Sequence, residues 1–223
     1  MQKNKFDVDF PHKKSFYTEM PLKYFGPPQN IVTIKQELKR TFLFFGAIRE
    51  YKRLDLFIQA ANVIGNGAHF VIAGSCKDWS IYESLIDINS NISCYIQFID
   101  NDMIPDLFTQ SDFLVLPYSD TTQSGLLLIA YKYSLPIIAI NHSYFNDMVT
   151  NGENGFILNE NTVDSLVSIL DYCINMPEDK LNNIKSNQSE YSIKYMNHTD
   201  VVSTFTLFID KYISCNANLK SLS

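Results

Sequence analysis

The sequence predicts an α/β protein with a doubly wound parallel sheet of about six strands. Two observations support this fold class. Short apolar runs rich in β-branched or aromatic residues recur along the chain and are bounded by breakers, as buried strands are. Between them lie segments whose apolar residues recur at helical spacing. Strands that alternate with helices build parallel sheets, and such sheets bind ligands outside the carboxyl ends of their strands.

Residues 1–40 are predicted to form an extended lead-in segment. Four prolines interrupt it, and one helix is expected near residues 31–39. The regular pattern begins at Thr41, so we expect one Rossmann-like domain over residues 41–215 and a flexible tail over residues 216–223.

The expected elements follow in chain order. Strands are predicted at residues 41–46, 69–74, 92–99, 113–116, 136–140 and 156–158. Helices are predicted from residue 54 past 61 and at residues 81–88, 103–110, 126–133, 144–150, 162–175, 179–194 and 200–213. Asp102 is a candidate N-cap of the helix at 103–110.

Composition restricts the class of partner and the compartment. The chain has 223 residues, of which 46% are hydrophobic and 19% charged, and a formal net charge of −6. These values indicate a globular chain and argue against nucleic-acid binding. The four cysteines lack metal-ligand spacing and are expected to be reduced thiols. Because neither a membrane span nor a secretory signal is evident, we expect a cytoplasmic protein, with peripheral membrane association as the alternative.

The segment from residue 112 to 161 organises the chain. An apolar strand ends at Pro117–Tyr118, a polar loop leads to Ser124 and Gly125, and a helix and a second strand follow. The loop would therefore lie at the carboxyl edge of a strand and at the amino end of a helix. Free N–H groups and the positive end of the helix dipole meet there, which suits an anionic group such as a phosphate.

Six motifs, in this order and spacing, resemble the C-terminal domain of GT-B glycosyltransferases, and most closely the retaining family 4. They are Phe44-Phe45-Gly46 with Lys52, Val71-Ile72-Ala73-Gly74, Ser111 to Tyr118, Thr122-Gln123-Ser124-Gly125, Leu135 to Ala139, and Asn151 to Ile157. The likeness extends over residues 41–212. Residues 1–40 resemble the segment that joins the two domains of such enzymes.

The resemblance implies a domain that binds a nucleotide-sugar donor. In that family the glycine after the first strand lets the diphosphate approach, and downstream cations neutralise it. Gly46 and Lys52 match, whereas Ala47 stands at the usual arginine position, with Arg49 nearby. The donor-binding candidates are Gly46, Arg49, Lys52, Tyr118, Thr122, Gln123, Ser124, Gly125 and Leu126, and the candidates on the sugar side are His142 and Ser143. No catalytic residue is identified, and neither a cofactor nor a metal is expected.

Other positions depart from the family pattern. Thr122 and Ala130 replace the two family glutamates, although one branch has Thr-Gln-Ser-Gly followed by such an alanine. Tyr144 stands where a glycine is usual. Only residues 1–40 precede the donor domain, so a partner chain would have to supply an N-terminal-type domain and the acceptor side. The isolated chain is therefore expected to transfer little or no sugar.

Three functions remain open from the sequence. The first is a glycosyltransferase donor domain that transfers sugar, with retention, to a glycan, glycoconjugate or lipid-linked acceptor in polysaccharide synthesis. The second is a degenerate, non-catalytic GT-B half that serves as an interaction subunit, which Ala47, Thr122, Ala130 and Tyr144 favour. The third is an unrelated Rossmann-like nucleotide binder, which is disfavoured because the G-x-G-x-x-G fingerprint is missing after Gly46.

Overall fold

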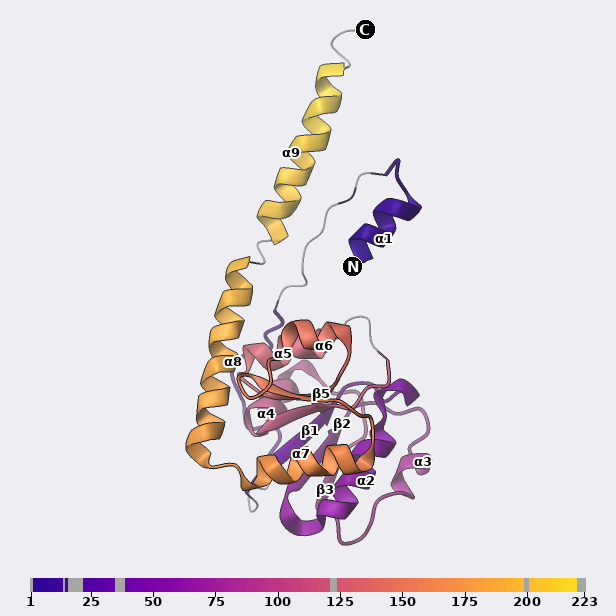
Figure 1. The fold of residues 1–223 in the computed structure, drawn as a ribbon, viewed down its shortest axis with the longest axis vertical. Coiled ribbons are helices and arrows are strands. Elements are labelled where there is room, and N and C mark those ends of the chain that lie inside the picture. Colours follow the sequence, from indigo (N-terminus) through magenta and orange to yellow (C-terminus); the bar gives the residue numbers. More distant parts are fainter. Residues whose placement is uncertain are drawn as a thin grey trace. The chain divides into compact units, whose positions relative to one another are not determined.

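The structure is a computed structural model that describes residues 2–13, 15, 22–34, 39–120, 124–198 and 201–219 (Figure 1). The chain divides into two compact units. One comprises residues 1–21 together with 193–223, and the other comprises residues 22–192. The first unit contains the helices α1 (Gln2–Asp9) and α9 (Val201–Leu219). The second contains the sheet and every described candidate site residue.

The sheet has six strands, all parallel, in the order β3-β2-β1-β4-β5-β6. The strands are β1 (Thr41–Phe45), β2 (His69–Ala73), β3 (Ile92–Tyr95), β4 (Phe113–Leu116), β5 (Ile137–Ile140) and β6 (Gly155–Leu158). The predicted fold class is confirmed and all six predicted strands are present, although β3 ends at Tyr95 and not at residue 99 as predicted.

Helices cover both faces of this sheet. The helices that follow β1 in the sequence are α2 (Leu54–Ile64), α3 (Ser80–Glu83), α4 (Ile104–Thr109), α5 (Gly125–Lys132), α6 (Ser143–Met148), α7 (Val163–Asn175) and, at the amino edge, α8 (Glu178–His198), with short 3₁₀ turns at η1 (Glu50–Lys52), η2 (Gly65–Gly67) and η3 (Asn101–Met103). Strand side chains point alternately to the two faces. Phe42 and Phe44 join the core under α2 and α7, whereas the ring of Phe45 meets that of Phe108 on α4 at 5.1 Å on the opposite face.

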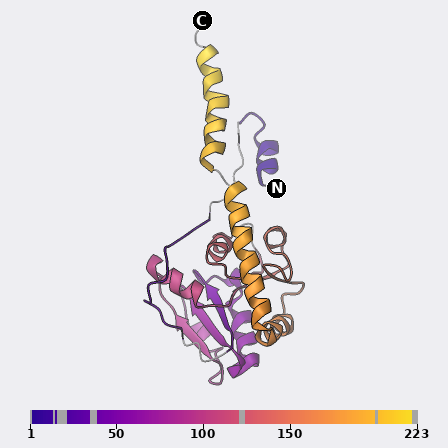
Figure 2. The same ribbon diagram turned by 90° about the vertical axis from the view of Figure 1, so that its left-hand side faces the viewer.

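The amino edge of the sheet is closed by α8 (Figure 2). The Lys185 ammonium lies 2.8 Å from the carboxylate of Asp112, just before β4, and Gln188 donates to the carbonyl of Leu135, just before β5. Arg40, just before β1, donates to the carbonyls of Cys173 and Met176. Because these contacts occupy the amino edge, the carboxyl edge is where a ligand can approach.

The segment ahead of β1 differs from its predicted form. Residues 31–34 are not helical, and residues 35–38 lie outside the described part of the chain. The reason is that side chains of α4 take the backbone N–H groups: Asp106 accepts from Ile31 and Val32, and Gln110 accepts from Ile34. A helix was also not predicted at α1.

Three further boundaries were wrong. Asp102 does not cap α4, because it lies inside η3 and α4 begins at Ile104. The helix expected at residues 81–88 ends at Glu83, and a turn in which Ser90 N–H donates to the Asp87 carbonyl follows. The last helix, α9, extends to Leu219, beyond its predicted end at residue 213.

Candidate phosphate-binding site

The candidate site lies where the order of the sheet reverses. β1 has β2 on one side and β4 on the other, so connections leave this point in opposite directions. Ligands of doubly wound sheets bind in the crevice at such a switch point, outside the carboxyl ends of the strands. Gly46 follows β1, Tyr118 follows β4, and α5 begins at Gly125.

Two glycines bring the backbone of this edge together. Gly46 has a φ of 93° and donates its N–H to the carbonyl of Ala73 at 2.8 Å. A β-carbon on Gly74 would lie 2.1 Å from the carbonyl oxygen of Gly46, which no side chain tolerates. The loops after β1 and β2 therefore contact each other backbone to backbone. On the side of Gly46 where another residue would carry its side chain, the nearest group is the ammonium of Lys52.

The ammonium of Lys52 is buried at this point. Lys52 is 8% exposed, and its Nζ lies 3.1 Å from the position that a β-carbon on Gly46 would take. Within the described residues no carboxylate lies within ion-pair distance of it, and its Nζ stands 5.5 Å over the ring of Tyr118. Burial, together with the nearby charge of Arg49, lowers the pKa of Lys52 to about 8. A buried cation without an anion is a costly arrangement that an anionic ligand would relieve.

The aromatic ring of Tyr118 packs against the ammonium of Lys52. Tyr118 is 3% exposed, and Tyr51 packs edge-on against its ring at 5.6 Å. Its hydroxyl lies beside Ser124 but reaches no partner with hydrogen-bond geometry in the described residues. Burial raises the pKa of Tyr118, so the hydroxyl stays protonated as a donor.

The amino end of α5 completes the site. Ser124 is extended at the N-cap but its side chain makes no capping bond, so this residue leaves the first N–H groups of the helix available to a ligand. The Leu126 side chain comes within 3.7 Å of the same β-carbon position on Gly46, which places the first turn of α5 beside Lys52. Tyr144 of α6 donates from its hydroxyl to the Ser124 carbonyl at 3.4 Å. The helix dipole adds positive potential here.

The remaining predicted residues are less closely placed. Arg49 is exposed at the start of η1, near enough to Lys52 to affect its pKa. His142 lies against Phe145, with its Nε2 3.7 Å from a carboxylate oxygen of Asp120, and Ser143 is exposed at the start of α6. Thr122 and Gln123 lie outside the described residues.

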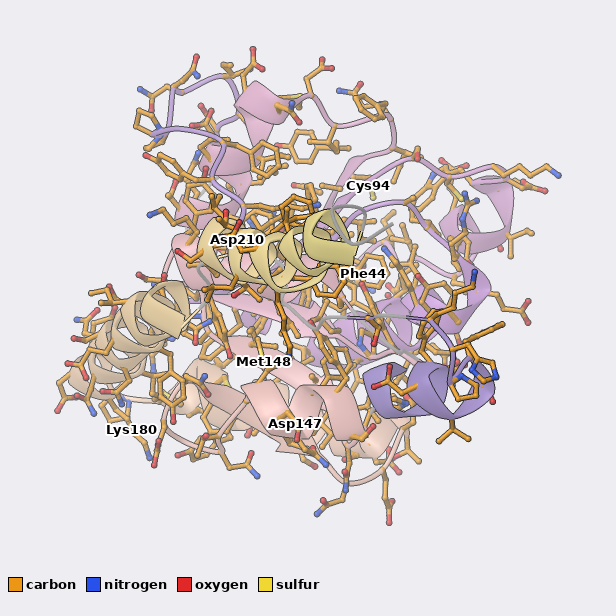
Figure 3. The ribbon with its side chains drawn as sticks, turned by 90° about the horizontal axis from the view of Figure 1, so that it is seen from above. Phe44, Cys94, Asp147, Met148, Lys180 and Asp210 are labelled. Atoms are coloured by element: carbon orange, nitrogen blue, oxygen red, sulfur yellow. The ribbon has the colours of Figure 1, made fainter. Side chains whose placement is uncertain are left out.

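Sequence reasoning missed Lys23. Its Nζ lies 3.6 Å from the position of a β-carbon on Gly125, the first residue of α5. Lys23 belongs to the irregular segment before β1, where no periodicity predicts what a residue touches. Asp147, by contrast, is exposed on α6 beside Met148 (Figure 3), as carboxylates on helices commonly are.

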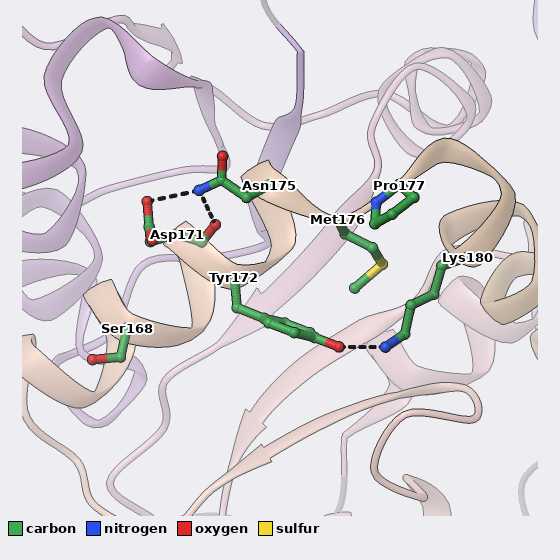
Figure 4. Close-up of a pocket in the computed structure, with 7 residues that line it drawn as sticks. All are labelled: Ser168, Asp171, Tyr172, Asn175, Met176, Pro177 and Lys180. Atoms are coloured by element: carbon green, nitrogen blue, oxygen red, sulfur yellow. Dashed lines mark hydrogen bonds between the residues drawn. The ribbon is translucent and has the colours of Figure 1, made fainter.

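A pocket of about 350 Å³ lies elsewhere, between α7 and the start of α8 (Figure 4). Its Met176 accepts a hydrogen bond from Arg40, which places the pocket at the amino edge of the sheet. The ammonium of Lys180 there already donates to the Tyr172 hydroxyl. This pocket therefore lies at the opposite edge of the sheet from the candidate site.

The arrangement suits a polyanion. Two lysines, one arginine and the amino end of a helix gather at one edge of a chain whose net charge is −6. Among the described residues, no group of three His, Cys, Asp or Glu side chains could hold a metal ion. None of the described helices is both long and apolar enough to cross a membrane.

Known proteins share this fold. The family model described as glycosyl transferases group 1 matches residues 30–191, more than half of the chain. A Klebsiella pneumoniae protein, called an uncharacterized 41.2 kDa protein in the cps region, is 24% identical over 180 residues. The match covers 79% of this chain and 48% of that protein, so the chain spans about half the length of this relative.

Two solved structures show the same architecture. S. aureus TarM, in complex with fondaparinux, alpha-GlcNAc-glycerol and UDP, has a TM-score of 0.71 at 14% identity, over 94% of this chain and 43% of that one. Anabaena Alr3699/HepE, in complex with UDP and glucose, has a TM-score of 0.64 at 17% identity, over 79% and 48%. At these identities the likeness shows the fold.

Proposed function

We propose that this chain, which belongs to the group 1 family of glycosyl transferases, binds the nucleotide diphosphate of a sugar donor at the switch point of its sheet. The observation that carries the proposal is the buried ammonium of Lys52, which has no ion-pair partner among the described residues and lies between the backbone of Gly46 and the amino end of α5. UDP bound to Alr3699/HepE and to TarM supports a uridine or similar nucleotide.

The diphosphate would occupy the open side of Gly46. Lys52 would donate to a phosphate oxygen, and the N–H groups at the start of α5 would donate to another. The buried hydroxyl of Tyr118 offers one more donor. In the reaction, the bond between the anomeric carbon and the diphosphate oxygen breaks and the leaving diphosphate keeps the electron pair, while the acceptor hydroxyl oxygen bonds to the anomeric carbon and its proton is released. Cations fixed in a desolvated place stabilise that charge as it develops.

The finer features are proposals as well. Transfer by the whole protein would retain the anomeric configuration, as expected for family 4 and for the branch with Thr122-Gln123-Ser124-Gly125. The acceptor would be a glycan or a lipid-linked glycoconjugate, and an N-terminal-type GT-B domain would present it. His142 and Ser143, which lie between the carboxyl end of β5 and the first turn of α6, would face the sugar.

Calorimetry with UDP, GDP, uridine and guanosine tests the binding. We expect one of the diphosphates to bind in the micromolar to millimolar range, and its nucleoside to bind more weakly by about tenfold or more, since each charge-assisted contact contributes about 1.5–3 kcal/mol. No heat from any diphosphate at millimolar concentration would refute the proposal. Because protein cations supply the positive charge, a chelator should leave the affinity unchanged.

The non-catalytic alternative has one observation in its favour. The Tyr144 hydroxyl reaches the Ser124 carbonyl, so its ring fills space beside the phosphate loop. The Tyr144→Gly variant distinguishes a donor-binding domain from the non-catalytic alternative. If the aromatic ring obstructs the donor, the glycine variant binds a nucleotide-sugar more tightly than the wild-type chain, whereas UDP affinity changes little.

A further inference from the structure

We infer that Lys23, from the segment ahead of the sheet, is a second phosphate-contacting cation at the amino end of α5. This inference rests on the proposed function. It extends that function by assigning part of the donor site to a segment outside the Rossmann-like core. Lys23 would bind the phosphate group that lies nearest the first turn of α5, while Lys52 binds from the side of Gly46.

The backbone around Lys23 is fixed to the sheet unit. Phe25 donates its N–H to the Tyr133 hydroxyl at 3.0 Å, and that hydroxyl donates to the Gly26 carbonyl at 2.9 Å. The ring of Tyr24 packs 5.6 Å from that of Tyr133 and lies 5.1 Å from the ammonium of Lys132. Tyr133 and Lys132 are at the end of α5, so the helix that presents its amino end to the ligand also holds the segment that carries Lys23.

A second anchor lies a few residues further along. One carboxylate, Asp106 of α4, accepts hydrogen bonds from four consecutive N–H groups, those of residues 29–32, at 2.6 to 3.1 Å. The side chain of Lys23 is therefore the flexible part of an otherwise fixed unit. It needs little reorganisation to reach a ligand, which limits the entropy lost on binding.

The surroundings of Lys23 indicate an anion as its partner. In the described part of the chain Lys23 makes no ion pair or hydrogen bond, although the chain as a whole is acidic. Its ammonium lies beside Gly125, where a helix presents its own positive end and Lys52 adds a buried charge. Like charges repel, so cations gathered without a carboxylate are stabilised when an anion binds between them.

The test compares Lys23→Ala with a matched control, Lys180→Ala, which removes the same charge from the opposite edge of the sheet. The probes are UDP, uridine and inorganic pyrophosphate, titrated by calorimetry into the full chain. We expect Lys23→Ala to weaken UDP and pyrophosphate by about three- to tenfold, as for an exposed cation that pairs with a phosphate. Uridine should be unaffected, and Lys180→Ala should match the wild-type chain.

Two further variants test whether charge is the cause. Lys23→Arg should restore the affinity to within about twofold, and Lys23→Glu should weaken it by more than the alanine does. Unchanged UDP affinity in Lys23→Ala would overturn this inference while the proposed function stands. Pyrophosphate binding that depends on Lys23, without UDP binding, would overturn the proposed function alone. If neither anion binds, both fall.

Discussion

The ammonium of Lys52 is buried, and its charge therefore changes with pH within the range of ordinary assays. Burial and the charge of Arg49 lower its pKa to about 8, and Tyr118 beneath it stays neutral because burial raises the pKa of that phenol. A lysine with a lowered pKa carries its charge below that value and loses it as the pH rises.

UDP affinity should therefore fall as the pH rises through 8, by up to about tenfold for each pH unit, until the pKa of Lys52 in the complex is passed. Lys52→Ala should weaken UDP by roughly tenfold to a hundredfold at pH 7 and flatten the profile. Calorimetry from pH 7 to 9, where the terminal phosphate is mostly ionised and the uracil ring stays neutral, measures both. A wild-type profile as flat as that of the variant would contradict this role.

The two lysines also show what a sequence can reveal about a site. Gly46 and Lys52 could be found because they follow a strand at a spacing that a family shares. Lys23 could not, because long-range bonds through Tyr133 decide where its segment lies. The burial of Lys52 could not be predicted either, because it depends on Tyr118, which follows another strand.

At the scale of elements, Asp106 joins α4 to the segment before β1. It is fully buried, which acts to raise the pKa of its carboxyl group, but hydrogen bonds from Val32, Gln29, Asn30 and Ile31 outweigh this effect and lower the pKa. A carboxyl group whose pKa is lowered in the folded state stabilises the fold at neutral pH and loses that contribution in acid.

Asp106→Asn places amide hydrogens against backbone donors and should reduce the free energy of unfolding by about 2–4 kcal/mol at pH 7. The difference from wild type should shrink as the pH falls below about 4, the ordinary value for aspartate, because the wild-type carboxylate then becomes protonated. Urea unfolding of both proteins at several pH values measures this. A difference that stays constant into acid would show that the charge is irrelevant.

The sequence could predict α4 from its apolar spacing but not this use of Asp106. A carboxylate in the first turn of a helix is ordinary, and its four donors lie more than seventy residues away. For the same reason, residues 31–34 do not take the helical form expected for residues 31–39. A segment whose sequence is compatible with a helix does not form one when side chains from elsewhere accept hydrogen bonds from its backbone N–H groups.

At the scale of the whole molecule, the six strands and all described site residues belong to the unit of residues 22–192. The sheet could be predicted because buried parallel strands are continuous apolar runs. The division of the chain could not, because α1 and α9 lie at opposite ends of the sequence.

A fragment comprising residues 22–192 should therefore unfold in a single cooperative transition and bind UDP within about threefold of the full chain. Thermal unfolding and calorimetry on the two proteins check this, with Lys52→Ala in the fragment as the control for specific binding. A fragment that folds but binds no UDP would show that residues outside this unit contribute to the site.

The anchoring of residues 25–32 also couples the candidate site to the folding of the segment before β1. Phe25 and Gly26 are bonded to Tyr133, and residues 29–32 are bonded to Asp106, all across more than seventy residues of sequence. Lys23 is held beside Gly125 only while these hydrogen bonds are formed. Local opening of the segment would therefore withdraw a cation from the site, and a bound phosphate would in turn resist that opening.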